Sequence, residues 1–374
     1  MREIDMSIKL LELFGGIGAP RKALENLGVD LKSIDYVEIL PYAVSAYNAM
    51  FDNSYKPQDI KNWDLNVDIL IHGSPCQDWS KAGLNDVTTG RSILYQKTLD
   101  IIENDLKPRP KVVIWENVVA LTQGNNQHYF YHYLNKLTEL GYRNYYSILN
   151  SLDFGIPQSR RRVFVVSIRN DLNAHFDFSK LEKKETRPLL DFLEEEDKFL
   201  RTSEFDVNQP SMLKSLESGK TKVAINYVDT ITTKQVRRNN AGVIFKKYQN
   251  FYCFPRKSDG KLINGNYNRV WSIDGYVGTL AVKEITKIGK LDNEELYFRY
   301  LTPRECFRLM GFDDKDFDKV LEKKIPKNRL YALAGNSIVV DVLEAIFKEL
   351  LRIIDFSHIG RKVNYTYFGQ QSLF

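Results

Sequence analysis

The chain has 374 residues, 43% of them hydrophobic and 27% charged, with a formal net charge of +5. This composition is typical of a soluble globular protein with room for two domains, and it excludes a disordered or fibrous chain. No run approaches the roughly eighteen uncharged apolar residues of a membrane helix, and residues 1–10 contain no apolar signal core. Cys76, Cys253 and Cys306 are odd in number and far apart. We therefore expect a cytoplasmic protein without disulfides, a metal site or a membrane partner.

The first 170 residues alternate short, β-branched apolar runs with amphipathic stretches. Strands are predicted at five of these runs, 8–14, 33–39, 67–73, 111–117 and 161–168. Helices are predicted from Pro20 to Gly28 and from about Ile93 to Asp105. The nearly continuous hydrophobicity of the strands favours a parallel sheet covered on both faces. Its alternation with helices predicts a doubly wound α/β domain.

From about residue 180 this alternation stops. An acidic patch at 191–197 precedes polar, turn-rich sequence, and residues 211–270 hold twelve Lys or Arg against three acidic residues, a local charge of +9. We interpret this region as an inserted second domain. On charge alone, a surface for a polyanion and a solvated basic loop region fit it equally well. A final helix is predicted after Asn336 and Ser337, where apolar residues recur at helical spacing.

A glycine-rich loop, FGGIG at 14–18, follows the first predicted strand and precedes the first helix. Its glycines permit a tight turn and close approach of a ligand to the backbone. A dinucleotide site would place a third glycine where Arg21 stands, which counts against NAD and FAD. Glu38 lies twenty residues beyond the loop, at the end of the second strand, where an acid can accept hydrogen bonds from ribose hydroxyls. The pair favours a nucleoside cofactor without a pyrophosphate, of which S-adenosylmethionine is the commonest; a surface acid is the alternative for Glu38.

Side chains of three chemically distinct kinds are expected at one edge of the sheet. Cys76 follows Pro75 where the third predicted strand ends, and Glu116 ends the fourth. Arg160 and Arg162 come just before or at the start of the fifth. Most lone cysteines are small buried hydrophobes, but a thiol, a carboxyl and guanidinium groups that converge on the ligand-binding edge of an α/β sheet indicate catalysis.

Six short motifs occur along the chain in the order found in DNA (cytosine-5) methyltransferases of the prokaryotic or phage type. They are FGGIG at 14–18, PCQ at 75–77, ENV at 116–118, QSRRR at 158–162, RYLTPRECFRLMGF at 299–312 and YALAGNSIVVDVLEAIF at 331–347. The chain resembles that family over almost its whole length. The resemblance implies a Rossmann-like S-adenosylmethionine-dependent methyltransferase domain at 1–180, completed by 325–374, with a smaller inserted target-recognition domain at 181–324.

The resemblance also implies a covalent mechanism. Cys76 matches the nucleophile that adds to carbon 6 of cytosine and so activates carbon 5. Glu116 matches the carboxyl that contacts or protonates ring nitrogen 3 and holds the exocyclic amine, for which burial should raise its pKa. Arg160 matches the side chain that contacts the base carbonyl and steadies the loop, while Arg162 matches a structural or DNA-contacting partner. The target base must be extruded into the pocket, and residues 80–92 match the loop that closes over it.

The same resemblance assigns ligand contacts. Asp59-Ile60 is a looser match, with Asp64 or Asp68 as competing positions, and Gly278 departs from the family's usual residue before Thr279-Leu280. The residues expected to bind S-adenosylmethionine, with S-adenosylhomocysteine as product, are Phe14, Gly15, Gly16, Ile17, Gly18, Glu38, Ile39, Asp59, Ile60, Pro75, Leu94, Asn336 and Ser337. The residues expected to contact DNA are Gln77, Ser80, Arg91, Arg237, Arg238, Arg269, Thr279 and Leu280.

The sequence therefore predicts a monomeric enzyme that makes 5-methylcytosine at a short site in double-stranded DNA. Its expected setting is restriction-linked modification or phage protection, with a cognate restriction endonuclease as a candidate partner. Methylation of transfer RNA, a silent DNA-binding regulator and a nicotinamide oxidoreductase are the alternatives. The intact Cys76, Glu116 and Arg160 argue against the regulator, because a protein that only binds DNA needs no nucleophile. The recognition sequence and the role of the tail 355–374 stay open.

Overall fold

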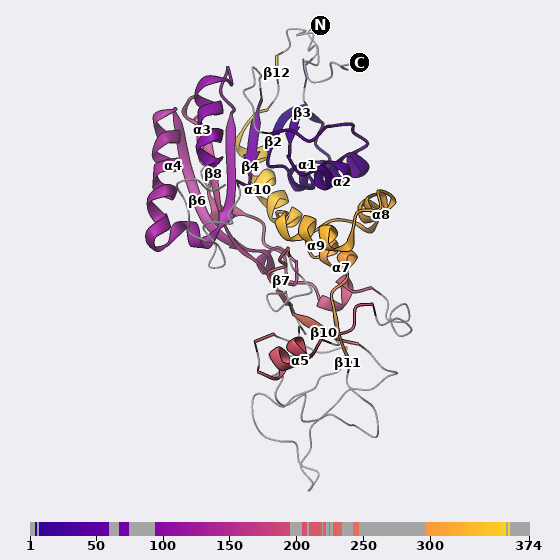
Figure 1. Cartoon of the computed structure of the whole chain (residues 1–374). Coiled ribbons are helices and arrows are strands. Elements are labelled where there is room, and N and C mark those ends of the chain that lie inside the picture. The colour runs from indigo at the N-terminus through magenta and orange to yellow at the C-terminus, as the bar shows by residue number, and fades with distance from the viewer. Residues whose placement is uncertain are drawn as a thin grey trace.

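The computed structural model shows a chain built around one large β-sheet (Figure 1). The described residues are 4–5, 7–59, 67–74, 94–194, 204–207, 209–218, 220–221, 224, 227–233, 242–246, 297–356 and 358–359. The sheet has six strands in the order β3-β2-β4-β5-β8-β6. In that order the strands are Leu31–Val37, Ile8–Leu13, Ile69–His72, Val112–Val118, Arg161–Arg169 and Tyr142–Asn150.

The direction of the strands corrects one expectation. β3, β2, β4 and β5 run parallel, but β8 is antiparallel to both of its neighbours. The prediction of a wholly parallel sheet is therefore wrong at 161–168, and β6 was not predicted. The hydrophobicity of a strand indicates burial on both faces but not the direction of the chain. The sequence of β8 therefore resembles those of the parallel strands. As a consequence, the start of β8 lies at the same edge as the ends of β4 and β5.

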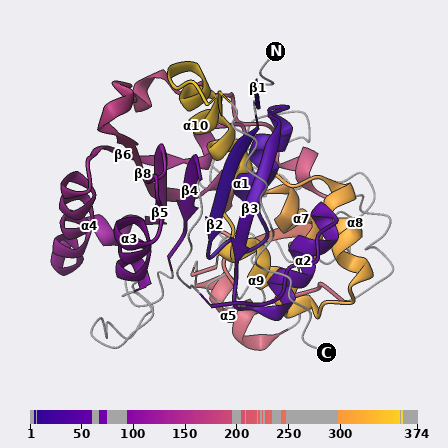
Figure 2. The same cartoon turned by 90° about the horizontal axis from the view of Figure 1, so that it is seen from above.

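Helices cover both faces of this sheet, as the alternation predicted (Figure 2). One apolar cluster joins α3 and α4 to the face that carries Leu11, Val113 and Val165. The other joins α1, α2 and α10 to the opposite face. The helices are α1 Ala19–Asn26, α2 Pro41–Phe51, α3 Leu94–Asn104, α4 Gln127–Glu139, α5 Pro210–Glu217, α7 Pro303–Arg308, α8 Asp314–Glu322, α9 Lys327–Asn336 and α10 Val340–Ile353.

Smaller strand pairs lie outside the main sheet. β10 and β11 pair antiparallel, well apart from the six strands in Figure 1, and β7 pairs in parallel with β9. β1 and β12 pair antiparallel near the two ends of the described chain. The strands are β1 Ile4–Asp5, β7 Gln158–Ser159, β9 Val228–Asp229, β10 Val243–Lys246, β11 Tyr297–Tyr300 and β12 His358–Ile359.

The C-terminal helices pack into the first part of the fold. α10 lies against α1, and Asn26 of α1 donates a hydrogen bond to Glu344 of α10 at 2.8 Å. Within the described residues, the segment 327–353 is long and apolar enough to cross a membrane, but 72% of its most apolar window is buried. Such burial is typical of a core helix.

Candidate active site

The glycine-rich loop 14–18 connects β2 to α1. Gly16 and Gly18 have φ angles of 55° and 74°, a region that favours glycine. A Cβ atom at Gly18 would lie 2.5 Å from the ring of Phe51, and one at Gly15 would lie 2.7 Å from the ring of Tyr36. Two of the glycines are therefore required by packing against aromatic rings from β3 and α2, which bring the loop close to the end of β3.

Glu38 lies where β3 ends and is bonded directly to this loop. Its Oε2 accepts a hydrogen bond from the backbone N–H of Gly16 at 3.1 Å, and its Oε1 accepts one from Leu40 at 3.0 Å. Burial raises the pKa of the Glu38 carboxyl, while the backbone N–H groups partly offset that rise. Ile39, 59% exposed, presents an apolar surface beside it. The loop, the acid and an apolar surface thus lie together, as a nucleoside site requires.

The predicted adenine-contacting residue is near this group. Asp59 is exposed and follows Gln58, whose N–H bonds to the carbonyl of Glu38 at 2.9 Å. Its competitor Asp68 is buried at the start of β4, at the opposite edge of the sheet, where it accepts a hydrogen bond from the N–H of Lys9. The geometry therefore favours Asp59 over Asp68.

Glu12, in β2, is a buried acid that sequence reasoning missed. Its Oε2 accepts a hydrogen bond from the hydroxyl of Tyr47 at 2.8 Å, and the side chain is fully buried. Burial raises the pKa of the Glu12 carboxyl to about 7. The sequence feature that could have revealed Glu12 is the presence of an acidic residue inside the apolar run IKLLELF.

Glu12→Gln is expected to change how stability depends on pH. Between pH 4.5 and about 7 the folded protein keeps a proton on Glu12 that the unfolded chain releases, so this group makes wild type less stable as pH rises. At about 1.4 kcal/mol per pKa unit, the loss reaches roughly 3 kcal/mol. The amide of the variant does not titrate and keeps an oxygen for Tyr47, so the variant should lack this loss. Urea unfolding at several pH values measures the difference.

Glu322→Gln, at an exposed position of α8, is the matched control for this experiment. It should follow wild type across the same pH range. If the Glu12 and Glu322 variants keep the same pH dependence as wild type, burial of Glu12 does not shift its titration.

Glu116 and Arg162 form an ion pair at the edge where β4 and β5 end. Nε of Arg162 lies 3.1 Å from Oε1 of Glu116, and Oε2 faces Gly73, where an added Cβ would lie 3.7 Å away. Arg162 pairs with Val118 across the β5–β8 ladder, two residues beyond Glu116 and on the same face. Burial raises the pKa of the Glu116 carboxyl, and the two nearby arginines lower it by less.

Arg160 has a different environment. Its Nη1 donates to the carbonyl of Ile231 at 3.0 Å, and its Nη2 donates to the carbonyls of Gly335 at 3.0 Å and Ser337 at 2.8 Å. The expectation gave Arg160 the contact with the base and Arg162 a structural or DNA role. In the structure, Arg162 faces the Glu116 carboxyl and Arg160 ties together three segments of the chain. The two role assignments stay predictions.

Some of the remaining predicted residues lie in the described part of the chain, and the others lie outside it. Leu94 begins α3 half-buried, while the exposed Asn336 ends α9 and the buried Ser337 follows it. Phe14 is half-buried with a φ of 55° at the end of β2, and Ile17 is buried within the loop. The residues that lie outside the described part of the chain are Ile60, Pro75, Cys76, Gln77, Ser80, Arg91, Arg237, Arg238, Arg269, Thr279 and Leu280.

Comparison with known proteins decides the family. The family model for the C-5 cytosine-specific DNA methylase matches residues 8–352. The chain belongs to this family. It is therefore an S-adenosylmethionine-dependent methyltransferase that acts on cytosine. The resemblance of the six motifs, and the Rossmann-like fold class it implied, are confirmed.

Relatives of the methyltransferase include restriction-associated and phage proteins. It is 32% identical to the type II methyltransferase M2.ScrFI of Lactococcus lactis subsp. cremoris, over 77% of this chain and 67% of that protein. It is 29% identical to the type II methyltransferase M.HaeII of Haemophilus aegyptius, over 93% and 94%. It is 27% identical to the orphan methyltransferase M.SPRI of Bacillus phage SPR, over 92% and 97%.

Solved structures share the fold. The S. pombe Dnmt2 methyltransferase superposes with a TM-score of 0.67 at 19% identity, covering 92% of this chain and 98% of that one. The Entamoeba histolytica methyltransferase EhMeth gives a TM-score of 0.67 at 17% identity, covering 93% and 99%. At these identities the similarity establishes the fold alone.

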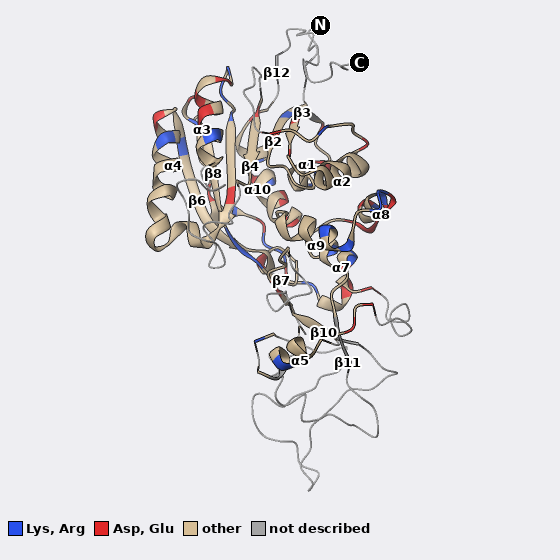
Figure 3. Cartoon of the chain, in the orientation of Figure 1, with Lys and Arg blue, Asp and Glu red and all other residues tan. Residues whose placement is uncertain are grey.

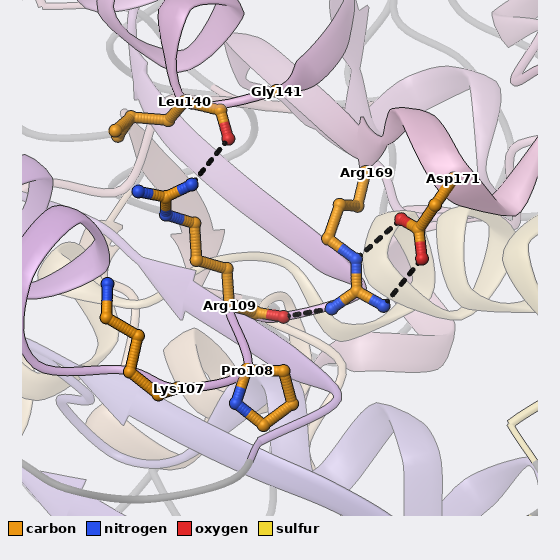
Figure 4. A pocket seen from close by; sticks show the side chains of 7 residues that line it. All are labelled: Lys107, Pro108, Arg109, Leu140, Gly141, Arg169 and Asp171. Carbon is orange, nitrogen blue, oxygen red and sulfur yellow. Dashed lines mark hydrogen bonds and ion pairs between the residues drawn. The ribbon is translucent and has the colours of Figure 1, made fainter.

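A hollow of about 460 Å³ lies at the opposite edge of the sheet, away from Glu116 (Figure 4). Its cationic groups are already engaged: Arg109 Nη1 donates to the carbonyl of Leu140 at 3.2 Å, and Arg169 forms an ion pair with Asp171 at 2.6 Å. This hollow is therefore separate from the edge of the sheet that carries Glu116. In the described part of the chain, no cluster of three His, Cys, Asp or Glu side chains could hold a metal ion.

Proposed function

We propose that the protein methylates carbon 5 of cytosine in double-stranded DNA through a covalent adduct with Cys76. The observation that carries this proposal is the buried carboxyl of Glu116, paired with Arg162 at the edge where β4 ends. Cys76 comes two residues after Ser74, the last described residue beyond β4. Two residues span at most about 7 Å of chain, so the proposal expects the thiol of Cys76, which lies outside the described residues, at the same edge of the sheet.

Glu116 is suited to act as an acid on the ring. The thiolate of Cys76 forms a bond to carbon 6 of cytosine, and the displaced electron pair places negative charge on ring nitrogen 3. A carboxyl whose pKa is raised by burial keeps its proton to a higher pH and delivers it to that nitrogen. Carbon 5 then attacks the methyl group. Loss of the carbon 5 proton to a base expels the thiolate, and ring nitrogen 3 returns its proton to Glu116, which restores both the neutral aromatic ring and the acid. Arg162 holds the carboxyl in place and presents a cation toward the base.

The glycine-rich loop and Glu38 fit S-adenosylmethionine. Gly16 and Gly18 keep the turn free of side chains, and Glu38 is oriented by two backbone N–H groups, so its carboxylate can still accept from ribose hydroxyls. Ile39 offers an apolar surface to a purine. When bound, S-adenosylmethionine supplies the methyl group and leaves as S-adenosylhomocysteine. The other predicted contacts, from Phe14 to Ser337, are part of this proposal.

DNA is proposed to bind through the region 181–324. Most of its basic window, 211–270, lies outside the described residues, so the DNA-contacting side chains stay predictions. In the described part, Figure 3 shows basic and acidic residues side by side on α7 and α8, for example Arg304 with Asp318 at 2.5 Å. Because those helices carry both charges, contacts with the DNA phosphates are expected from the basic window 211–270 instead. The reacting carbon is stacked inside a duplex, so the base must be flipped out.

The expected setting is the cytoplasm, as a monomer, in DNA modification linked to restriction or phage protection. A relative named as a type II methyltransferase supports the link to restriction. A relative named as a phage orphan methyltransferase supports the role in phage protection. In the restriction-linked setting, a cognate restriction endonuclease is the proposed partner.

Exchanging residues 181–282 for the same region of a relative with a known target should transfer that target to the chimera. The physical reason is that base-edge contacts determine sequence, whereas phosphate contacts do not. Methylation mapping of a plasmid measures the outcome, with a chimera exchanged only at α4, residues 127–139, as control. An unchanged target in the first chimera would contradict the domain assignment.

The substrate itself is tested by methyl incorporation. Duplex DNA and transfer RNA are offered separately with labelled S-adenosylmethionine. The proposal predicts label in DNA at a rate at least a hundredfold above that in RNA. Label only in transfer RNA would refute it in favour of the RNA-modifying alternative.

A further inference from the structure

Ser74 is the described residue that directly precedes segment 75–93. Its Oγ accepts a hydrogen bond from the indole Nε1 of Trp115 at 3.0 Å, and its carbonyl accepts one from Nδ2 of Asn117 at 3.2 Å. Trp115 and Asn117 are alternate residues of β5, so they share one face of the sheet, while Glu116 between them points to the other. Ser74 is therefore held by the two neighbours of the catalytic carboxyl.

The helix that follows this segment in the sequence also contacts Trp115. α3 begins at Leu94, immediately after residue 93, and Tyr95 is its second residue. The ring of Tyr95 stacks on that of Trp115 with 6.0 Å between centroids and an angle of 28°. The Trp115 side chain thus contacts Ser74, directly before segment 75–93, and Tyr95, the second residue after it.

Trp115 is itself firmly packed. It is 1% exposed, its ring lies 5.7 Å from His72 at an angle of 6°, and it lies 4.0 Å from Tyr133. His72 Nε2 and the hydroxyl of Tyr133 are hydrogen-bonded at 2.8 Å. Burial lowers the pKa of His72 to about 3, so the ring beside the indole stays neutral at ordinary pH. The indole is therefore held in place by packing between β4, β5, α3 and α4.

We propose that Trp115 is a positioning residue for methyl transfer, holding Ser74 and Tyr95, which lie on either side of segment 75–93 in the sequence, in register with Glu116. The inference rests on the proposed function, in which Cys76 of that segment is the nucleophile. The thiol and the carboxyl must meet the same cytosine ring, and Trp115 links the strand of one to the segment of the other. A misplacement of about 1 Å at such a site can cost on the order of a hundredfold in rate.

The test is a double-variant cycle with Trp115→Phe and Ser74→Ala. The first keeps a ring for Tyr95 and His72 but removes the N–H donor, and the second removes its acceptor. Each should lower kcat by about tenfold or more, while KM for DNA and for S-adenosylmethionine changes less than about threefold. Because both remove the same hydrogen bond, the double variant should be no slower than the slower single variant.

Tyr142→Phe is the matched control. It deletes another buried hydrogen bond of the same apolar cluster, from Tyr142 to the carbonyl of Pro110 at 2.8 Å, at the opposite edge of the sheet. Urea unfolding should show similar stability for all three single variants, and kcat of Tyr142→Phe should equal that of wild type.

Two results overturn the inference alone: an active wild type with unchanged kcat in both Trp115→Phe and Ser74→Ala, or effects on kcat that simply multiply in the double variant. If Trp115→Phe fails to fold, a wild-type kcat in Ser74→Ala is sufficient to overturn it. A wild-type protein that methylates no DNA overturns the proposed function, and the inference falls with it.

Discussion

Cys76→Ala is expected to abolish methyl transfer while DNA binding stays within about threefold of wild type. Without the thiolate, carbon 5 of cytosine is too weak a nucleophile to attack the methyl group. The loss should reach on the order of a thousandfold or more, because the remaining groups cannot replace a covalent step. Single-turnover methyl transfer and a DNA-binding titration measure the two quantities. Cys76→Ser should be equally inactive, since a hydroxyl is far harder to ionise than a thiol.

The buried Cys306 provides the control, because Cys306→Ala removes a thiol from α7 without touching the edge of the sheet. DNA that carries 5-fluorocytosine gives a second readout. Fluorine on carbon 5 cannot leave as a proton, so wild type should be trapped on the DNA and Cys76→Ala should not. Retained methylation in Cys76→Ala, or a trapped complex without the thiol, would refute the covalent mechanism.

Glu116→Gln is expected to lower kcat by about 10²- to 10⁴-fold, the usual contribution of a general acid. The amide can still donate a hydrogen bond to ring nitrogen 3, but it cannot transfer the proton that thiolate addition requires. In wild type the acid form is present below its pKa, and burial raises that pKa. The rate should therefore fall as pH rises through it. Stopped assays across a pH series measure both the rate and this slope.

The variant should lack the part of the pH slope that Glu116 causes. Glu139→Gln, on the exposed side of α4, is the control and should behave as wild type. A wild-type rate in Glu116→Gln would show that the carboxyl has no acid role and that Arg162 alone stabilises the charge.

The site could be predicted to the extent that it follows from strand ends. Parallel strands end at one edge, so the spacing of the loop 14–18 and Glu38 was enough to expect them together, and they are joined by a 3.1 Å hydrogen bond. Glu116 was expected at the same edge because it ends the fourth predicted strand, and the family motifs supplied its role. Chain direction was not readable at 161–168, because an apolar run buried on both faces looks the same in either direction.

The individual side-chain contacts could not be predicted, because their partners lie far away in the sequence. Arg160 finds its acceptors at Ile231, Gly335 and Ser337, and only the folded chain brings these carbonyls together. The link between Ser74 and Trp115 spans 41 residues. Nothing in the run KVVIWEN marks the tryptophan as more than a core residue.

Bisulfite sequencing of unmethylated genomic DNA, after incubation with the protein and S-adenosylmethionine, tests the central claim most directly. Cytosines methylated at carbon 5 resist conversion, so the experiment reports the base, the methylated position and the target at once. We predict protected cytosines within one short consensus and none when Cys76→Ala replaces wild type. DNA in which every cytosine is converted would contradict the assignment of this chain as a DNA cytosine methyltransferase.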